Sequence, residues 1–220
     1  WIIVDDGSMD DSSLRLLEQI ASKDPRIKIL HQNNMGPSAA RNNGINAATT
    51  EYVYILDADD LEEPTSLEYN YWALMKNPKK SWSFTASTGF QEKEYLWDVR
   101  FDPEGMKTKN TLSVSALIRK QDALSVGGYT IKEEAFDEDW HFWLKLMAKG
   151  YSCVQLRNEY LHWYRILNSG RMASIHTDNQ KKESNQKIIS EQAAFVINPK
   201  DPIIYPITTY EEFANINESK

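Results

Sequence analysis

Short apolar runs alternate with amphipathic stretches through the first half of the chain. The apolar runs are rich in β-branched and aromatic residues, and they predict strands at residues 1–5, 27–30, 52–56 and 81–90. The stretches between them carry apolar residues at helical spacing and predict helices at about residues 11–23, 36–48 and 64–76. Alternating strands and helices predict an α/β fold with a doubly wound, mainly parallel sheet flanked by helices.

Two of these helices have further signals. Pro37 lies in the first turn of the second helix, where a missing N–H costs nothing. In the third helix we expect one packed face that contains Leu67, Tyr71, Leu74 and Met75.

The second half of the chain is less regular. The polar stretch Gln91–Thr111 contains aromatic residues but no clear period, and it predicts a long loop or hairpin beside a site. A strongly periodic helix should follow residues 136–139 and end at Gly150, with Trp140, Trp143, Leu144 and Met147 on one face. Strands are expected at residues 113–118, 151–156 and 159–166, and a polar helix at residues 177–195.

Composition narrows the function classes. The formal net charge is -7 and no basic stripe is visible, which argues against nucleic acid as a partner. Cys153 is the one cysteine, and its apolar neighbours predict a core position. Without an apolar run of about 18 residues or a visible signal peptide, we expect a cytoplasmic location, with the inner face of the membrane left open.

The first acidic cluster, Asp5 and Asp6, follows the first strand and precedes Gly7. In a parallel sheet, ligands bind at the carboxyl ends of the strands, so these carboxylates could accept hydrogen bonds from a base or ribose. An acidic strand-to-helix turn that only caps the next helix is the alternative.

The second cluster, Asp57, Asp59 and Asp60, follows the strand at residues 52–56. Three neighbouring carboxylates repel one another unless a cation or strong hydrogen bonds offset the repulsion. Hard oxygen ligands suit Mg²⁺ or Mn²⁺, so all three are candidate metal ligands. A solvated acidic loop is the alternative.

The third cluster includes Glu138 and Asp139, at the start of the helix before Gly150. A carboxylate there could act as a general base, although helix capping also favours acidic residues in a first turn. Arg41 and Arg165 could each reach phosphate or form an ordinary salt bridge. For His162, a packed core position is favoured over a ligand role.

Four motifs that occur in order along the chain resemble those of family 2 glycosyltransferases, which are inverting enzymes with the GT-A fold. They are Val4–Ser8, Gly36–Asn42, Leu56–Asp60 and Glu138–Leu144. Each motif is weak alone, but the set is specific, and the similarity extends from Trp1 to about Arg165.

The resemblance implies transfer of a sugar, with inversion, from a nucleotide-sugar donor (usually a UDP-sugar) to a glycan or another hydroxyl acceptor. It also implies roles for individual residues. Asp5 and Asp6 would contact the nucleotide base, Arg41 would lie near the donor, and Arg165 would belong to the segment that closes over the pyrophosphate. Asp57 and Asp59 would form the metal and ribose motif, with Asp60 as a substitute metal ligand. Asp139 would be the catalytic base and Glu138 its neighbour.

The sequence departs from the family at its start, because the apolar strand and polar turn that precede the Asp-Asp-Gly-Ser motif are absent. We therefore expect an N-terminally incomplete catalytic domain over residues 1–195, with unpaired strand edges unless another segment fills the gap. Residues 196–220 would form a tail or linker, and association with a membrane surface or further domains is left open. A non-catalytic nucleotide-sugar or carbohydrate-binding module is the main alternative, kept open by Trp82, Trp97 and Trp163. A nucleotidyltransferase is another.

Overall fold

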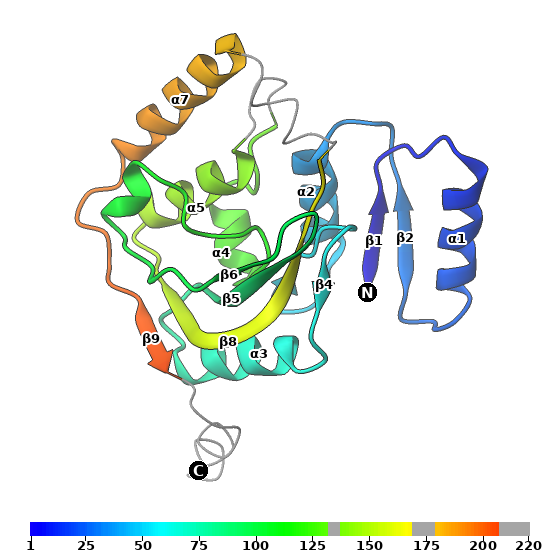
Figure 1. Ribbon diagram of the computed structural model, residues 1–220, viewed down its shortest axis with the longest axis horizontal. Helices are drawn as coiled ribbons and strands as arrows, with labels where there is room; N and C mark the ends of the chain where they lie inside the picture. Colours follow the sequence, from blue (N-terminus) through cyan, green and yellow to red (C-terminus); the bar gives the residue numbers. More distant parts are fainter. Residues whose placement is uncertain (132–136, 169–178, 207–220) are drawn as a thin grey trace.

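The computed structural model describes residues 1–131, 137–168 and 179–206. Helices and strands follow one another in the order that the apolar pattern predicts (Figure 1). The helices are α1 Asp11–Ala21, α2 Pro37–Ala47, α3 Ser66–Lys76, α4 Lys120–Ser125, α5 Glu138–Ala148 and α7 Asn179–Ala193, with a short 3₁₀ helix η1 at Gly105–Lys107. The strands are β1 Ile2–Asp5, β2 Lys28–His31, β3 Tyr52–Tyr54, β4 Leu61–Glu62, β5 Trp82–Gln91, β6 Tyr95–Trp97, β7 Leu117–Arg119, β8 Cys153–Ile166 and β9 Ile203–Pro206.

The strands form two sheets. β1 pairs with β2 in parallel, and a larger sheet has the order β3-β7-β5-β8-β4, with β6 added to β5 and β9 added to β8. The longest ladder joins β5 and β8 in parallel, whereas the antiparallel pairings of β3, β4, β6 and β7 span only two or three residues each. The predicted α/β fold with a mainly parallel, helix-flanked sheet is confirmed.

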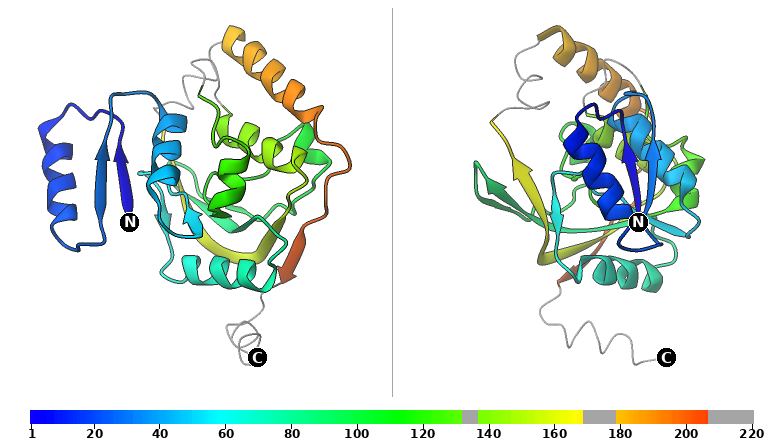
Figure 2. Two further views of the ribbon diagram at one scale, coloured as in Figure 1. Left: turned by 180° about the vertical axis from the view of Figure 1, so that it is seen from behind. Right: turned by 90° about the vertical axis from the view of Figure 1, so that its right-hand side faces the viewer.

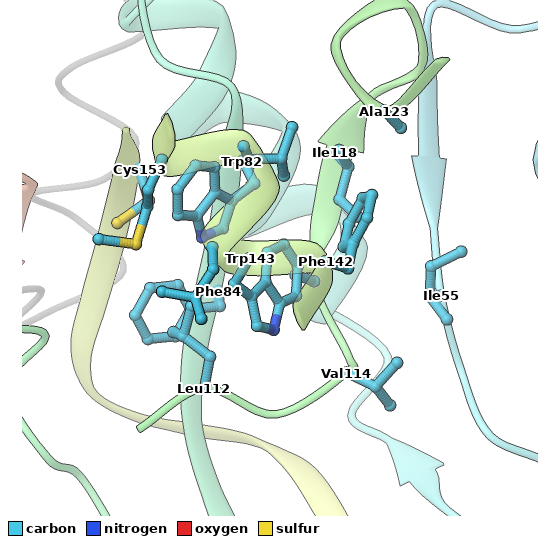
Figure 3. Packing of buried hydrophobic residues seen from close by; sticks show 14 of the residues in the cluster. Ile55, Trp82, Phe84, Leu112, Val114, Ile118, Ala123, Phe142, Trp143 and Cys153 are labelled. Atoms are coloured by element: carbon cyan, nitrogen blue, oxygen red, sulfur yellow. The ribbon is translucent and has the colours of Figure 1, made fainter. Parts of the chain in front are cut away.

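Helices cover both faces of the larger sheet. α4 and α5 lie on one face and α3 on the other, and the long strand β8 curves between them (Figures 1 and 2). On the α5 face, Trp82 of β5 stacks on Trp143 of α5 with ring centroids 5.4 Å apart, and Phe142 packs beside them (Figure 3). Cys153 lies in this core, as its apolar neighbours predict, and burial raises the pKa of its thiol.

The packed face of α3 differs from the prediction. Leu74 is buried, but Leu67, Tyr71 and Met75 are exposed. The residues that pack against β5 and β8 are Tyr69, Asn70, Ala73 and Leu74, a stripe rotated around the helix from the predicted one. Asn70 is buried although it is polar: its Nδ2 donates to the Ser66 carbonyl at 2.9 Å, which satisfies the N–H side of the amide.

The two strands predicted at residues 151–156 and 159–166 are one bent strand, β8. Its register with β5 shifts after Thr85, opposite Arg157–Glu159, and Asn158 adopts a positive φ of 65°. A β-bulge inserts residues without ending the ladder, which explains why the polar break does not separate two strands. β9, which lies in the predicted tail, pairs in parallel with the first half of β8.

The unit formed by β1, α1 and β2 stands beside the larger sheet and meets it through α2 (Figure 1). In the described part of the chain β1 pairs only with β2, and β3 only with β7. All of α1 is described and none of its residues is fully buried, although its apolar residues follow the expected spacing. Over the described ranges, no helix is both long and apolar enough to cross a membrane.

Candidate functional site

The first acidic cluster joins the end of β1 to the loop between β2 and α2. The Asp6 carboxylate accepts hydrogen bonds from the backbone N–H groups of Met35 and Gly36, both at 2.8 Å, and from the Gln32 amide at 2.7 Å. Gly7 has a φ of 86°, and a Cβ there would lie 2.9 Å from the backbone nitrogen of Asn34. Asp6 therefore fixes the loop that immediately precedes α2.

Asp5 has similar local partners. Its carboxylate accepts from the Ser8 N–H at 3.0 Å and lies 2.9 Å from Nδ1 of His31. Hydrogen bonds from Ser8 and then from His31 lower the pKa of the Asp5 carboxyl, because they stabilise its charged form. The cap of α1 is Asp10, whose Oδ1 accepts from the Ser13 N–H at 2.8 Å, so Asp5 and Asp6 do not cap that helix. Their contact with a nucleotide base stays a prediction.

Arg41, on α2, joins the second and third acidic clusters. Its Nη2 lies 2.8 and 2.9 Å from the two carboxylate oxygens of Asp57, and its Nη1 lies 2.9 Å from Oε1 of Glu138. The Arg41 side chain is only 11% exposed and its guanidinium lies over the Tyr129 ring, 5.4 Å from the centroid. Two carboxylates, which lie 16 and 97 positions from Arg41 in the sequence, therefore meet at its guanidinium.

The next residue on α2, Asn42, fixes the other side of this arrangement. Its amide Nδ2 donates to the Tyr129 carbonyl at 2.8 Å, and its Oδ1 accepts from the Tyr129 N–H at 2.7 Å. These two bonds hold the loop that carries the Tyr129 ring against α2. The sequence argument did not single out Asn42, although it follows Arg41 within the quoted motif.

The three aspartates of the second cluster have three different environments. Asp57 pairs with Arg41, Asp59 is exposed, and Asp60 is buried. Burial raises the pKa of the Asp60 carboxyl to about 6, and the Arg165 N–H, which it accepts at 2.9 Å, partly offsets this. Arg165 also donates from Nε to the Asp59 carbonyl at 2.6 Å. Arg165 thus contacts the predicted metal loop directly.

Asp139, the predicted base, begins α5 beside Glu138. Its Oδ1 accepts from the Trp140 N–H at 2.7 Å and its Oδ2 from the Asn110 amide at 3.1 Å. Burial, and then the charge of Glu138, raise the pKa of the Asp139 carboxyl to about 7. A carboxylate that is ionised only near neutral pH is a stronger proton acceptor than an ordinary one, which suits a general base.

The loop after β6 reaches Asp139, as the sequence predicts for residues 91–111. Asn110 bonds to Asp139, and the Trp140 indole N–H donates to the Met106 carbonyl at 2.7 Å. Of the tryptophans considered for carbohydrate binding, Trp82 is fully buried, Trp163 is half-buried, and Trp97 is 38% exposed. Trp82 therefore belongs to the core.

The side chains around Asp59 that could coordinate a metal determine how a cation could bind. Over the described residues there is no group of three or more His, Cys, Asp or Glu side chains placed to hold a metal ion together. Mg²⁺ in phosphate chemistry is usually held by one or two carboxylates plus substrate oxygens and water. The exposed Asp59, next to the paired Asp57, fits that kind of shared site, whereas an all-protein metal cage does not fit.

Comparison with known proteins identifies the family of the chain. The model of the family described as "Glycosyl transferase family 2" matches residues 1–130. The chain is 49% identical over 70 residues to the cholesterol galactosyltransferase of Borreliella burgdorferi, which is 32% of this chain and 19% of that protein. It is 27% identical over 177 residues to an uncharacterized glycosyltransferase of Methanocaldococcus jannaschii, which is 76% of this chain and 60% of that one.

Among solved structures, residues 1–349 of TarS from S. aureus in complex with UDP-GlcNAc superpose with a TM-score of 0.68 at 18% identity. The superposition covers 91% of this chain and 58% of that chain, and it supports the GT-A-like fold. The chain spans less than two thirds of each of these proteins. Because the family model matches more than half of the chain, the protein belongs to glycosyl transferase family 2.

Proposed function

We propose that this chain transfers a sugar from a UDP-sugar to a hydroxyl group of a glycan acceptor, with inversion at the anomeric carbon. The observation that carries the proposal is the Arg41 bridge, the pair of contacts from one guanidinium to Asp57 and Glu138. Asp57 begins the Asp57–Asp60 loop, which we call the donor loop, and Glu138 is next to the candidate base. Family membership and the UDP-GlcNAc in the TarS complex support a nucleotide-sugar donor.

The reaction is a single in-line displacement. Asp139 accepts the proton of the acceptor hydroxyl, whose oxygen forms a bond to the anomeric carbon as the bond from that carbon to the diphosphate oxygen breaks. The departing UDP keeps the electron pair of the broken bond. Because acceptor and leaving group lie on opposite faces of the sugar, the configuration inverts. The raised pKa of Asp139 and its hydrogen bond from Asn110 favour a fixed, basic carboxylate.

The donor end would be held by the remaining predicted residues. Asp59 would bind Mg²⁺ or Mn²⁺ together with phosphate oxygens, and the bound cation would offset negative charge on the departing diphosphate. Asp57 would bind the metal or the ribose, and Arg165 would face the pyrophosphate. Asp5 and Asp6 would contact the nucleotide base. Asp60, which is buried, fits a ligand role less well than Asp59 does.

The aromatic side chains beside this loop support a glycan acceptor. Tyr95 and Trp97 occupy alternate positions of β6, and their rings pack edge to face 6.2 Å apart. Burial, and then the charge of Asp60, raise the pKa of the Tyr95 and Tyr164 hydroxyls. An exposed ring can cover the apolar face of a pyranose. We place the reaction in glycan or polysaccharide biosynthesis on the cytoplasmic side, at the inner face of the membrane.

The test is a donor screen with the full-length protein. UDP-sugars are incubated with Mn²⁺ and a panel of glycan acceptors, and UDP release and the product are measured, with the anomeric configuration read by NMR. We expect metal-dependent release of UDP and an inverted glycoside. Saturable binding of UDP-sugars without product under all conditions would support the binding-module alternative instead.

A further inference from the structure

A group of buried polar side chains lies directly behind the Asp57–Asp60 loop. We call it the inner polar cluster, and it consists of Tyr54, Asp60, Glu62 and His162. The side chains of His162 and Asp60 are only 3% and 1% exposed. The sequence argument favours a core position for His162, and the structure agrees, but the histidine lies between two carboxylates.

The contacts within the cluster run from strand to strand. Nδ1 of His162 lies 2.7 Å from Oε1 of Glu62, and the Tyr54 hydroxyl donates to the same oxygen at 2.7 Å. On the other side of the ring, Nε2 of His162 faces Oδ2 of Asp60 at 3.5 Å. His162 therefore stands between the carboxylate of β4 and the carboxylate that ends the donor loop.

The sheet topology brings these residues together. β4 is a two-residue strand, and its Glu62 pairs directly with His162 of β8. Tyr54 is the last residue of β3, just before the loop, and Asp60 immediately precedes β4. The loop is therefore fixed at its start through Tyr54 and at its end through Asp60.

The composition of this cluster is costly for stability alone. Two carboxylates and an imidazole leave water, and Asp60 Oδ2, Glu62 Oε2 and His162 Nε2 have no hydrogen-bond partner among the residues described. Apolar side chains of similar volume often give equal or greater stability than buried charged groups. A positioning role accounts for the cluster better than core packing does.

We propose that His162 is a positioning residue that holds Asp60 inward, so that the loop presents Asp57 and Asp59 to the donor. The Asp60 N–H closes the loop by donating to the Asp57 carbonyl at 3.1 Å, and the Arg165 N–H binds Asp60 Oδ1 from the β8 side. In this view Asp60 braces the loop and is not a metal ligand. The part of this proposal that concerns donor binding rests on the proposed function, whereas the part that concerns the position of the loop does not.

The variants His162→Leu and His162→Gln test the proposal. Leucine keeps the volume and removes both polar contacts, whereas glutamine keeps an amide that can reach one carboxylate. Leu74→Ala is the control for lost packing, because Leu74 is fully buried on α3 in the hydrophobic cluster against which Tyr54 packs. It lowers the free energy of unfolding but removes none of the polar contacts of the inner polar cluster.

Two measurements are made on the full-length proteins. Hydrogen exchange of the loop amides at residues 57–60 reports on the position of the loop, and calorimetry with UDP and Mn²⁺ reports on the donor site. For His162→Leu we expect faster exchange of the loop amides and about tenfold weaker binding of UDP with Mn²⁺, with His162→Gln intermediate and Leu74→Ala unchanged in both.

The outcomes separate the two proposals. Loop exchange in His162→Leu and His162→Gln that matches wild type, or that changes equally in Leu74→Ala, would overturn the positioning role. Faster loop exchange in the His162 variants alone supports that role. If UDP then binds all four proteins equally, or none of them, the positioning role stands and the proposed donor site is wrong.

Discussion

The turn after β1 and the start of α5 both carry paired acidic residues, yet their carboxylates behave in opposite ways. Hydrogen bonds from Ser8 and His31 lower the pKa of Asp5, whereas burial and the charge of Glu138 raise the pKa of Asp139 to about 7. The first environment stabilises the ion, and the second destabilises it.

This difference separates two uses of the same residue type. A carboxylate that accepts several backbone N–H groups, as Asp6 does, fixes a turn and gains stability from being charged. A carboxyl that is held in a partly buried position with a raised pKa costs stability and gains reactivity, which is the usual pattern at functional sites. Substitutions at four residues test this difference.

The largest effect is expected for Asp139→Asn. Removal of a general base typically costs about 10²- to 10⁴-fold in rate, so kcat should fall by that factor while donor binding changes little. Asparagine can still accept from the Trp140 N–H through its Oδ1. Turnover is measured at saturating UDP-sugar, and undiminished transfer would remove Asp139 from the mechanism.

The same substitution should stabilise the fold at pH 8. The carboxyl ionises near its usual pKa of 3.8 in the unfolded chain but only near 7 in the folded chain. Stability should therefore fall as the pH rises between these values, and neutral asparagine should recover about 1–3 kcal/mol at pH 8. Chemical denaturation of both proteins at pH 5 and pH 8 provides the measurement. A variant that is less stable than wild type at pH 8 would mean that the Asp139 carboxylate is stabilised by its surroundings.

Arg41→Ala should affect both folding and catalysis. Loss of the guanidinium leaves Asp57 and the buried Glu138 without their shared cation, and breaking a buried ion pair typically costs about 3–5 kcal/mol. Arg41→Lys should recover part of the stability but less of the activity, because the single ammonium nitrogen cannot replace the two guanidinium nitrogens that bind Asp57 and Glu138 separately. Denaturation and kcat/KM are compared across the three proteins, and equal activity in the lysine variant would contradict the bridge geometry.

The smallest effects are expected in the first cluster. Asp6→Asn removes a charged acceptor from the N–H groups of Met35 and Gly36 and should lower the free energy of unfolding by about 1 kcal/mol. Urea denaturation at pH 7 measures this loss.

Asp5→Asn should show its effect through pH. The lowered pKa of Asp5 contributes stability above the usual value of 3.8, and this contribution disappears as the pH falls through the lower folded value. The difference in stability between Asp5→Asn and wild type should therefore shrink in acid. A difference that is constant from pH 7 to pH 2 would mean that the Asp5 charge does not contribute.

Much of the fold could be predicted from the order of apolar runs, because each run forms a strand or packs a helix. The pattern could not show the continuity of β8, since a bulge at Asn158 looks like a loop in sequence. It also assigned the wrong face to α3, because the buried face includes the polar Asn70, which hydropathy counts as surface.

The sequence motifs singled out individual residues but not the contacts between them. The motifs pointed to Arg41, Asp57 and Glu138, yet nothing in the sequence indicated that a single guanidinium joins the two carboxylates. Likewise, three aspartates in one short motif looked equivalent, and only the three-dimensional structure distinguishes the paired Asp57, the exposed Asp59 and the buried Asp60. The sequence could not link His162 to the acidic loop, because its partner Glu62 lies 100 residues away.

The most direct test of the account is the pH dependence of kcat/KM for the full-length enzyme with a UDP-sugar and Mn²⁺. We expect kcat/KM to be constant above about pH 7 and to fall tenfold per pH unit below it, because Asp139 must be ionised to accept the acceptor proton. The residual activity of Asp139→Asn should lack this inflection. A wild-type profile that stays flat down to pH 5, or an inflection that persists in Asp139→Asn, would contradict the assignment of Asp139 as the base.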